Sequence, residues 1–419
     1  MWDLNHLGGI LLKVTKLSAS ILIIYILFYL QIWGDNHLVL YGSAVIMIFS
    51  MLVHCFQVGY LDMSNIPYGI WNNLIIVIYA LLTGILIVND YNTVIGSSVT
   101  FASYSLVCIA ICYVSSVEKS LDWLLILLIG VASICSLYAL VHGYIWEGYG
   151  RTLSKTNNPH TYAAVMYLGI FSTVFIQQKS KIKRLIICTV LVSIFFYSII
   201  ECGSRKYLLV STCFIILWIC TTLKTRWIEG DTRERIHVLI IGVAVIVIGV
   251  YLYREIYMHS SISIRMMNDN DLGDKNRIKN YKKAWEIFLN HPLFGCGYDQ
   301  FQYLSGTNVH SHSTYAEALA DFGIIGCFLY FSPFIYTIRK LYSRVFITDK
   351  DVLSLLVLAL CIAELFLGAG QIFFMDFYHF LAWTIVFYYA ADTSLIKQSI
   401  TIKNTTNKRT YKYIRYSKN

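Results

Sequence analysis

Charged residues and prolines are scarce in this chain. Only 14% of its 419 residues are Asp, Glu, Lys or Arg and only 4 are Pro, whereas 57% are hydrophobic. A soluble globular protein carries about 25% charged residues, so that class is excluded. Disorder is excluded by the high apolar content. The eleven cysteines contain no CxxC pair and are expected to be small core residues; only Cys202 and Cys296 form an outward-side pair that merits testing as a disulfide.

What the chain has instead is a series of long apolar stretches. Each is roughly 17 to 25 residues long, enough to cross a ~30 Å hydrocarbon layer as a helix. We therefore predict an all-α, polytopic membrane helix bundle with about 12 transmembrane helices. The stretches lie near residues 17–33, 38–59, 71–88, 96–116, 121–142, 160–177, 185–202, 207–223, 236–253, 316–337, 351–369 and 374–391.

The distribution of Lys and Arg predicts the orientation. When alternate connections are assigned to the cytoplasm, 22 of the 33 basic residues lie inside and 11 outside. The positive-inside rule then places both termini in the cytoplasm. The net charge of +9 is explained by topology, so it does not indicate a nucleic-acid partner. We expect residues 1–391 to form the bundle, and the basic tail 392–419 to lie near anionic lipids.

One connection is long: residues 254–315, between predicted helices nine and ten, outside the membrane. Long loops without structure of their own are uncommon unless they have a function. Ile278, Tyr281, Trp285 and Phe288 recur with helical spacing in this loop and predict an amphipathic helix on the membrane surface, ending at Pro292. A helix that merely covers the end of the bundle is the alternative.

Several arginines lie on the outer side, against the positive-inside bias. They are Arg151, Arg205, Arg277 and, as a weaker companion, Arg265. Guanidinium groups bind phosphates bidentately and stay charged in partly desolvated sites. Each arginine taken alone is also explained by snorkelling to the interface. Together they predict a site for an anionic ligand.

Two histidines lead from the loop into the next predicted helix. His310 and His312 alternate with serines, and Glu317 and Asp321 follow one helical turn apart. A histidine here can accept or position a proton near neutral pH; a helix cap or a packing role is the alternative. A zinc site is not favoured, because the loop lacks a third ligand at metal spacing.

These features resemble the O-antigen ligase and polysaccharide polymerase superfamily of bacterial membrane glycosyltransferases. The resemblance covers roughly residues 150–340. The departures are Ser313 after the histidine, His160 after Asn-Pro, and the additional His310. The marks, in family order, are Arg151 with Asn158 and Pro159; Ser204 and Arg205 with Leu209; Arg277, Trp285, Pro292, Gly295 and Gly297; and His312 with Gly323 and Gly326.

The resemblance implies a reaction on the outer face of the bacterial plasma membrane, with an undecaprenyl-diphosphate-linked oligosaccharide as substrate. Arg205, Arg277, Arg151 and Arg265 would bind the diphosphate, and Arg205 would also be catalytic. We expect His312 to act on the acceptor hydroxyl, because of its spacing to Gly323, with Glu317 as second choice. His310 and Trp285 are accessory candidates. We expect no cofactor and no metal; a flippase and a chain-length regulator are further candidate partners.

Three functions remain open at this point. No residue separates a polymerase, which extends the lipid-linked chain, from a ligase, which transfers it to lipid A core; the form HSHSTYAEALADFGIIG favours the polymerase by resemblance. A transporter or flippase would carry polar groups near the bilayer midplane. The candidates for such polar groups are Glu364, His54 and His379. They are fewer than the charged residues expected at the outer membrane edge, so a transporter is less favoured.

Overall fold

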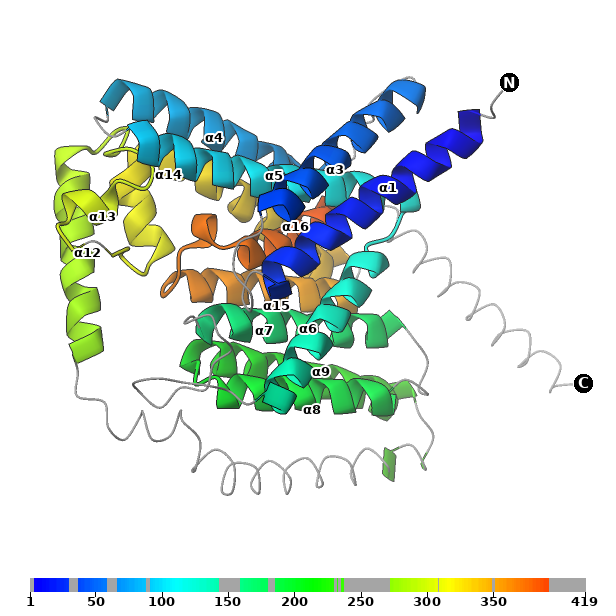
Figure 1. The fold of residues 1–419 in the computed structure, drawn as a ribbon. Helices are drawn as coiled ribbons and strands as arrows, with labels where there is room; N and C mark the ends of the chain where they lie inside the picture. Colours follow the sequence, from blue (N-terminus) through cyan, green and yellow to red (C-terminus); the bar gives the residue numbers. More distant parts are fainter. Residues whose placement is uncertain are drawn as a thin grey trace, which may run out of the picture.

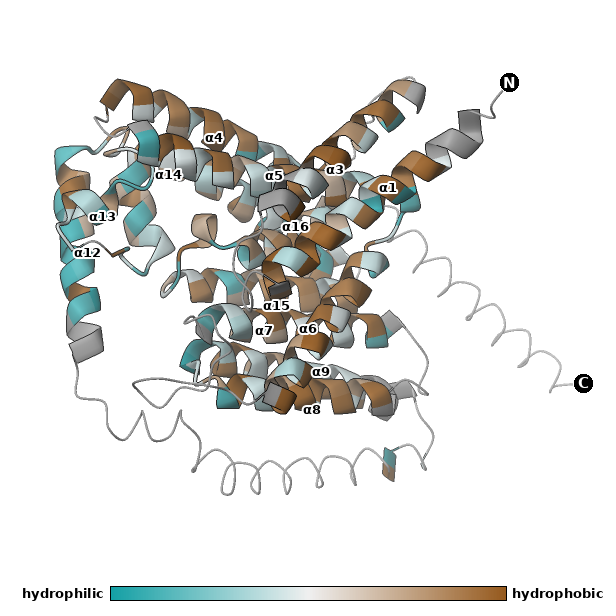
Figure 2. Ribbon diagram, viewed as in Figure 1, coloured by the Kyte–Doolittle hydropathy of each residue, from teal (hydrophilic) through white to brown (hydrophobic). Residues whose placement is uncertain are grey.

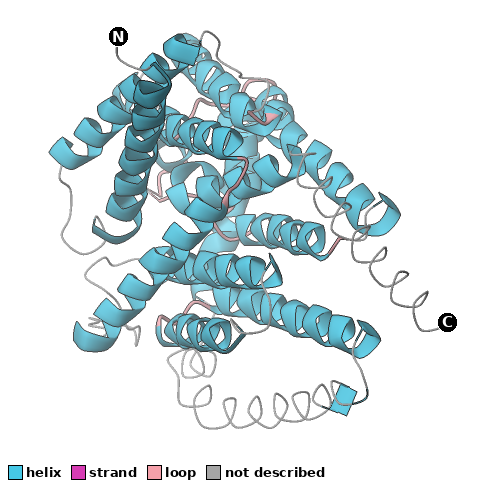
Figure 3. Ribbon diagram, turned by 90° about the vertical axis from the view of Figure 1, so that its right-hand side faces the viewer, coloured by secondary structure: helices cyan, strands magenta, loops and turns pink. Residues whose placement is uncertain are grey.

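The computed structural model describes residues 4–29, 37–58, 66–87, 91–142, 159–179, 185–229, 232, 235–236, 272–307, 309–348 and 351–391. These residues form helices and connecting turns, and the described part of the chain contains no strand (Figures 1 and 3). The main helices are α1 (Leu4–Ile24), α3 (His37–Val58), α4 (Tyr68–Ile87), α5 (Tyr91–Glu118), α6 (Asp122–His142), α7 (Pro159–Lys179), α8 (Leu185–Glu201), α9 (Arg205–Glu229), α12 (Leu272–Asn290), α14 (Thr314–Ser343), α15 (Val352–Gly368) and α16 (Phe377–Ala391).

A helix covers every predicted apolar stretch except the ninth, 236–253, which lies outside the described residues apart from Ile236. Among the described residues, six helices are long and apolar enough to cross a membrane, and three shorter ones are also apolar. The all-helical membrane class is therefore confirmed, while the count of twelve and the side of each connection stay predictions.

The outer faces of the bundle are strongly apolar. Phe56 is 82% exposed, Leu86 81% and Phe328 73%. Figure 2 shows hydrophobic residues along the outward faces of α4, α6 and α8, with more hydrophilic residues on α12. Such surfaces are unfavourable in water and favourable in lipid. No disulfide joins Cys202 to Cys296, and both residues are buried.

Neighbouring helices pack in pairs and triplets. The closest associations are α1 with α3, α4 with α5, and α6 and α8 on either side of α7; α14 contacts α4, and α15 contacts α16. Tyrosine and phenylalanine rings fill much of the space around α14 and α16: Phe334 lies 4.2 Å from Trp383 between ring centroids, and Phe322 lies 5.5 Å from Tyr298. This packing fixes α14 against α16 and the loop that carries Tyr298.

The helix α14 breaks at Gly323, which has a φ of +64°. The break exposes backbone groups that need partners. The turn after α12 supplies them: Ile324 N–H donates to the Pro292 carbonyl at 2.9 Å, and Cys296 N–H donates to the Ala320 carbonyl at 2.8 Å. A Cβ at Gly323 would lie 2.5 Å from the backbone nitrogen of Gly295. The two glycines, both part of the family resemblance, therefore allow a close contact between the break in α14 and the turn after α12. We call this contact the joint.

The helix expected in the long loop is confirmed as α12, which contacts α14 at one edge of the bundle (Figure 1). The side of α12 that is buried differs in part from the prediction. Ala284, Ile287 and Phe288 are buried, whereas Ile278 and Trp285 are exposed. The predicted apolar residues are thus split between a buried side and an exposed side, because α14 covers only one side of the helix.

Candidate active site

Arg205 and Lys206 begin helix α9 after a tight turn at Gly203, which has a φ of +73°. The preceding Ser204 is fully buried, and its hydroxyl lies 3.0 Å from Nδ1 of His160 near the start of α7. Both basic side chains are partly exposed. The turn therefore places two adjacent cations at the end of the bundle that carries α12.

Lys206 is a site residue that sequence reasoning did not select. Its ammonium donates a hydrogen bond to the Gly370 carbonyl, which follows α15. It also lies close enough to Arg277 and Asp376 to interact with both electrostatically. The sequence signal was present, since Lys206 follows Arg205 on the outer side, but nothing in it indicates a contact with residue 370.

Arg277, on α12, is half-buried. The helix is fixed to the rest of the site at two points close by: the Tyr281 hydroxyl donates to the Ala369 carbonyl at 3.1 Å, and the Asn280 amide donates to the His310 carbonyl at 3.3 Å. These bonds hold the guanidinium near Lys206 and His312.

His312 lies between the two helices that carry these cations. Its backbone has a φ of +62°, an uncommon value for a residue other than glycine and one that costs about 1–3 kcal/mol. Its side chain is exposed. Although the residue is exposed at the protein surface, the surrounding protein partly desolvates its ring. This desolvation and the nearby charges of Arg277 and Lys206 lower the pKa of His312, which favours the neutral imidazole. We call Arg205, Lys206, Arg277 and His312 the basic half of the site.

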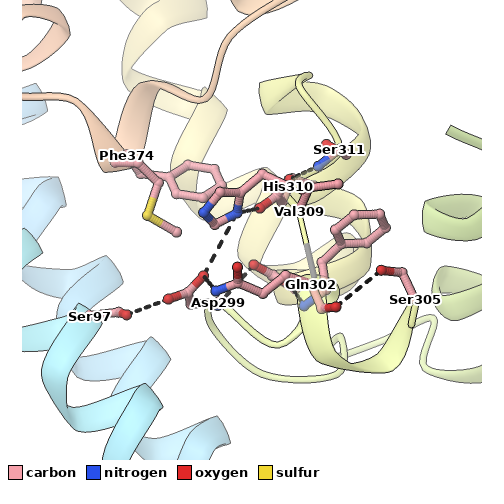
Figure 4. A network of polar contacts seen from close by, with 12 residues as sticks. Ser97, Asp299, Gln302, Ser305, Val309, His310, Ser311 and Phe374 are labelled. Atoms are coloured by element: carbon pink, nitrogen blue, oxygen red, sulfur yellow. Dashed lines mark hydrogen bonds and ion pairs between the residues drawn. The ribbon is translucent and has the colours of Figure 1, made fainter. Parts of the chain in front are cut away.

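His310 lies only two residues away but in a contrasting environment (Figure 4). Its Nδ1 is 2.6 Å from Oε1 of Glu317 and 3.8 Å from Oδ1 of Asp299. Burial lowers the pKa of His310, but the hydrogen bond to Glu317 and the charges of Glu317, Asp299 and Asp376 outweigh it, so the pKa is raised. We call Asp299, His310, Glu317 and Asp376 the acidic half.

Glu317 is completely buried on the first turn of α14. One of its oxygens faces His310, and the other accepts the Ser311 N–H at 2.6 Å. Both oxygens are thus engaged with the loop that carries the histidines. This placement favours a role in holding that loop rather than direct contact with a substrate.

Asp299 closes the other side of His310. Its Oδ2 accepts a hydrogen bond from the Ser97 hydroxyl on α5 at 2.5 Å, and its Oδ1 accepts one from the Gln302 amide at 3.1 Å. Its own N–H donates to the buried carboxylate of Asp321 at 2.9 Å. Burial is the largest cause of the raised pKa of Asp299. Sequence reasoning did not select this residue.

The segment 369–376, between α15 and α16, and the first turn of α16 join these elements. The Gln371 carbonyl accepts hydrogen bonds from the N–H and hydroxyl of Thr314, at 2.9 and 2.7 Å. The Gln371 side chain accepts from the Tyr207 hydroxyl and donates to Tyr378, whose hydroxyl donates to Asp376 at 2.6 Å. Asp376 is thereby held where it interacts electrostatically with both Lys206 and His310.

The side chains of Asp299, His310 and Glu317 offer ligand atoms that lie within 4.8 Å of one another, close enough to hold a metal ion. The ligands that the sequence did not reveal beside His310 are Asp299, from the same long loop, and Glu317, from the first turn of α14. Nδ1 of His310 is, however, hydrogen-bonded to Glu317, and a carboxylate–histidine pair of this kind is stable without a cation.

Of the remaining predicted site residues, the structure describes Trp285, which does not belong to this cluster. Trp285 is 53% exposed and packs on Phe288, with ring centroids 5.1 Å apart. Arg151 and Arg265 lie outside the described residues. From the predicted set, the structure thus brings together Arg277 with His312 and His310 with Glu317. Arg205 is adjacent to Lys206.

Comparison with known families matches residues 190–331 to the model described as O-antigen ligase. The chain carries an O-antigen ligase family domain. All of the basic half lies within the matched residues, whereas Ser97 and Asp376 lie outside them. No curated protein matches the chain. The domain and the apolar helices together describe a multi-pass membrane protein of the O-antigen ligase and polymerase type.

Proposed function

We propose that this protein is a polysaccharide polymerase that joins undecaprenyl-diphosphate-linked repeat units on the outer face of the bacterial plasma membrane. The observation that carries the proposal is the convergence of Lys206, Arg277 and His312 at one end of an apolar bundle, inside an O-antigen ligase domain. Such a site suits a diphosphate whose lipid tail remains in the membrane.

The basic half binds the donor diphosphate. Arg277 offers planar, bidentate recognition, and Lys206 adds a compact charge. Arg205, at the start of α9, is the further cation on this side. Fixed cations of this kind stabilise the negative charge that develops on the leaving diphosphate, so the reaction proceeds without a metal ion.

His312 takes the proton of the acceptor hydroxyl. The hydroxyl oxygen forms a new bond to the anomeric carbon of the donor glycan, the bond from that carbon to the diphosphate oxygen breaks, and the diphosphate leaves with the electron pair. The lowered pKa of His312 keeps a lone pair available near neutral pH. A bound diphosphate would offset the cations that oppose protonation of this ring.

The experiment gives purified protein in lipid bilayers a labelled undecaprenyl-diphosphate oligosaccharide with no other acceptor. A ladder of longer lipid-linked products is the expected result. Transfer only after lipid A core is added would instead establish a ligase, and no product with either acceptor would refute the glycosyltransferase proposal.

A transporter is not favoured by the bundle interior. Glu364 and His379 are both buried and hydrogen-bonded to each other at 2.6 Å, and Nδ1 of His54 is hydrogen-bonded to Tyr113. Each intramembrane candidate therefore already has a partner within the bundle. The accessible polar groups of the site lie instead at the outer end of α14.

A further inference from the structure

His310 and His312 are separated by a single serine but meet opposite charges. Arg277 and Lys206 act on His312, whereas Glu317, Asp299 and Asp376 act on His310. The left-handed backbone at His312 turns the chain between them. A diphosphate donor is attracted to the first environment and repelled by the second. The ring of His312 therefore lies in surroundings that suit the donor diphosphate, and the ring of His310 lies in surroundings that do not.

The orientation of the His310 ring is fixed by its surroundings. Nδ1 faces Glu317 at 2.6 Å, and Glu317 is itself held by the Ser311 N–H and by complete burial. A neutral imidazole that donates through Nδ1 presents its lone pair at Nε2. The side chain is 33% exposed, and none of the described residues makes a hydrogen bond to Nε2. In its neutral form the partly exposed ring thus offers one oriented acceptor atom, Nε2.

The supports of this ring come from several helices. Ser97 on α5 holds Asp299, which lies on the second side of the ring (Figure 4). Asn280 on α12 holds the His310 backbone. Asp376, beyond the matched domain, adds a carboxylate with one oxygen bonded to Tyr378. Carboxylates beside a neutral imidazole offer hydrogen-bond acceptors to sugar hydroxyls.

We propose that His310 binds a hydroxyl of the acceptor sugar through Nε2, and that Glu317 is the positioning residue that orients His310. The inference rests on the proposed glycan transfer and assigns the acceptor glycan to the acidic half. The donor diphosphate occupies the basic half, where its charge is compensated. This arrangement explains why two histidines of one loop are kept in such different settings.

The test measures donor and acceptor dependence separately in full-length protein reconstituted in bilayers. A labelled lipid-diphosphate donor is held saturating while a water-soluble repeat-unit oligosaccharide, which lacks diphosphate, is varied as acceptor; the two are then exchanged. His310→Ala should raise the acceptor KM by about tenfold and leave the donor KM within about twofold, since it removes one hydrogen bond to the acceptor.

Two further variants keep the test decisive. His310→Gln retains an amide donor for buried Glu317 and serves if the alanine variant is unstable; it too should raise the acceptor KM. At a pH where the His310 ring is neutral in both proteins, Glu317→Gln should also raise the acceptor KM, and Glu317→Gln combined with His310→Ala should be no worse than His310→Ala alone. His291→Ala, at an exposed position after α12, is the matched control and should behave as wild type.

An unchanged acceptor KM in both His310 variants, or an increase in the donor KM alone, would overturn the assignment. These outcomes are distinct from failure of the proposed function, which would appear as absence of product in the wild-type protein. Additivity of the Glu317 and His310 substitutions would contradict the positioning role, because independent residues contribute separately.

Discussion

The two halves of the site are built differently. The basic half draws its side chains from α9, α12 and the loop before α14, all within the matched O-antigen ligase domain. The acidic half depends on Ser97 and Asp376, which lie outside that domain. Binding of a diphosphate needs little more than converging cations, whereas orienting a sugar hydroxyl needs a ring held in one direction. Backbone carbonyls beyond the domain, at Ala369 and Gly370, support both α12 and Lys206. The comparison therefore indicates that the side chains of the donor site all come from the domain, whereas the acceptor site also takes the Asp376 side chain from beyond it.

The largest effect should come from removing charge in the basic half. Arg277→Ala should lower kcat/KM for the lipid-linked donor by about 10²- to 10³-fold, because a fixed cation that stabilises the leaving diphosphate is lost. Lys282→Ala, exposed on the same helix, is the control and should stay within about twofold. Product formation in bilayers measures the activity of both variants. Equal activity would contradict the assignment of donor binding to the basic half.

The next effect concerns the joint that holds the two halves together. Gly323→Ala should destabilise the fold by about 2–4 kcal/mol, because alanine would adopt a positive φ and its Cβ would meet the backbone of Gly295 and Leu293. Gly130→Ala, in α6 with no atom within 4 Å of the new Cβ, is the control. Thermal unfolding in detergent measures the difference; the same Tm for both variants would show that the joint does not matter.

A third prediction sharpens the electrostatic contrast between the histidines. Glu317 raises the pKa of His310, so Glu317→Gln should lower it. The neutral ring binds the acceptor; kcat/KM for the acceptor should therefore rise with pH, and the midpoint of that rise should move to lower pH in the variant. The pH profile of acceptor dependence, measured with saturating donor, reports the shift. A midpoint that stays in place or moves upward would contradict the assigned contact.

The smallest effect is expected from metal removal. Treatment with EDTA should change the rate by less than about twofold, since cationic side chains supply the charge stabilisation. Loss of activity that is restored by one divalent cation would instead place a metal among Asp299, His310 and Glu317, whose ligand atoms are close enough to hold one.

The sequence predicts the helices well because each apolar stretch carries its own signal, and it predicts α12 together with Arg277 and His312. It does not reveal the faces of α12, since only the packing of α14 decides which side is covered. The contacts of Lys206 with Gly370 and of Asp299 with Ser97 join residues 164 and 202 positions apart. No local pattern encodes such pairs. His310 and Glu317 were expected from the sequence, but the placement of Asp299 and Asp376 near His310 became visible only in the fold.

The role of Glu317 shows the same limit. From the sequence it is an acid near two histidines, suited to act as a base. Its complete burial, and the engagement of both oxygens by His310 and Ser311, are consequences of where α14 begins. The Ser313 cap and the Gly323 break set that position, and neither indicates by itself which way the carboxylate points.

The central claim is the separation of a diphosphate-binding half from an acceptor-binding half, and a binding measurement tests it without turnover. Purified full-length protein in bilayers is titrated with undecaprenyl diphosphate, the product that leaves the donor. Arg277→Ala should weaken binding by at least about tenfold, whereas His310→Ala should leave the Kd unchanged. Equal weakening by both substitutions, or unchanged binding in Arg277→Ala, would contradict the account.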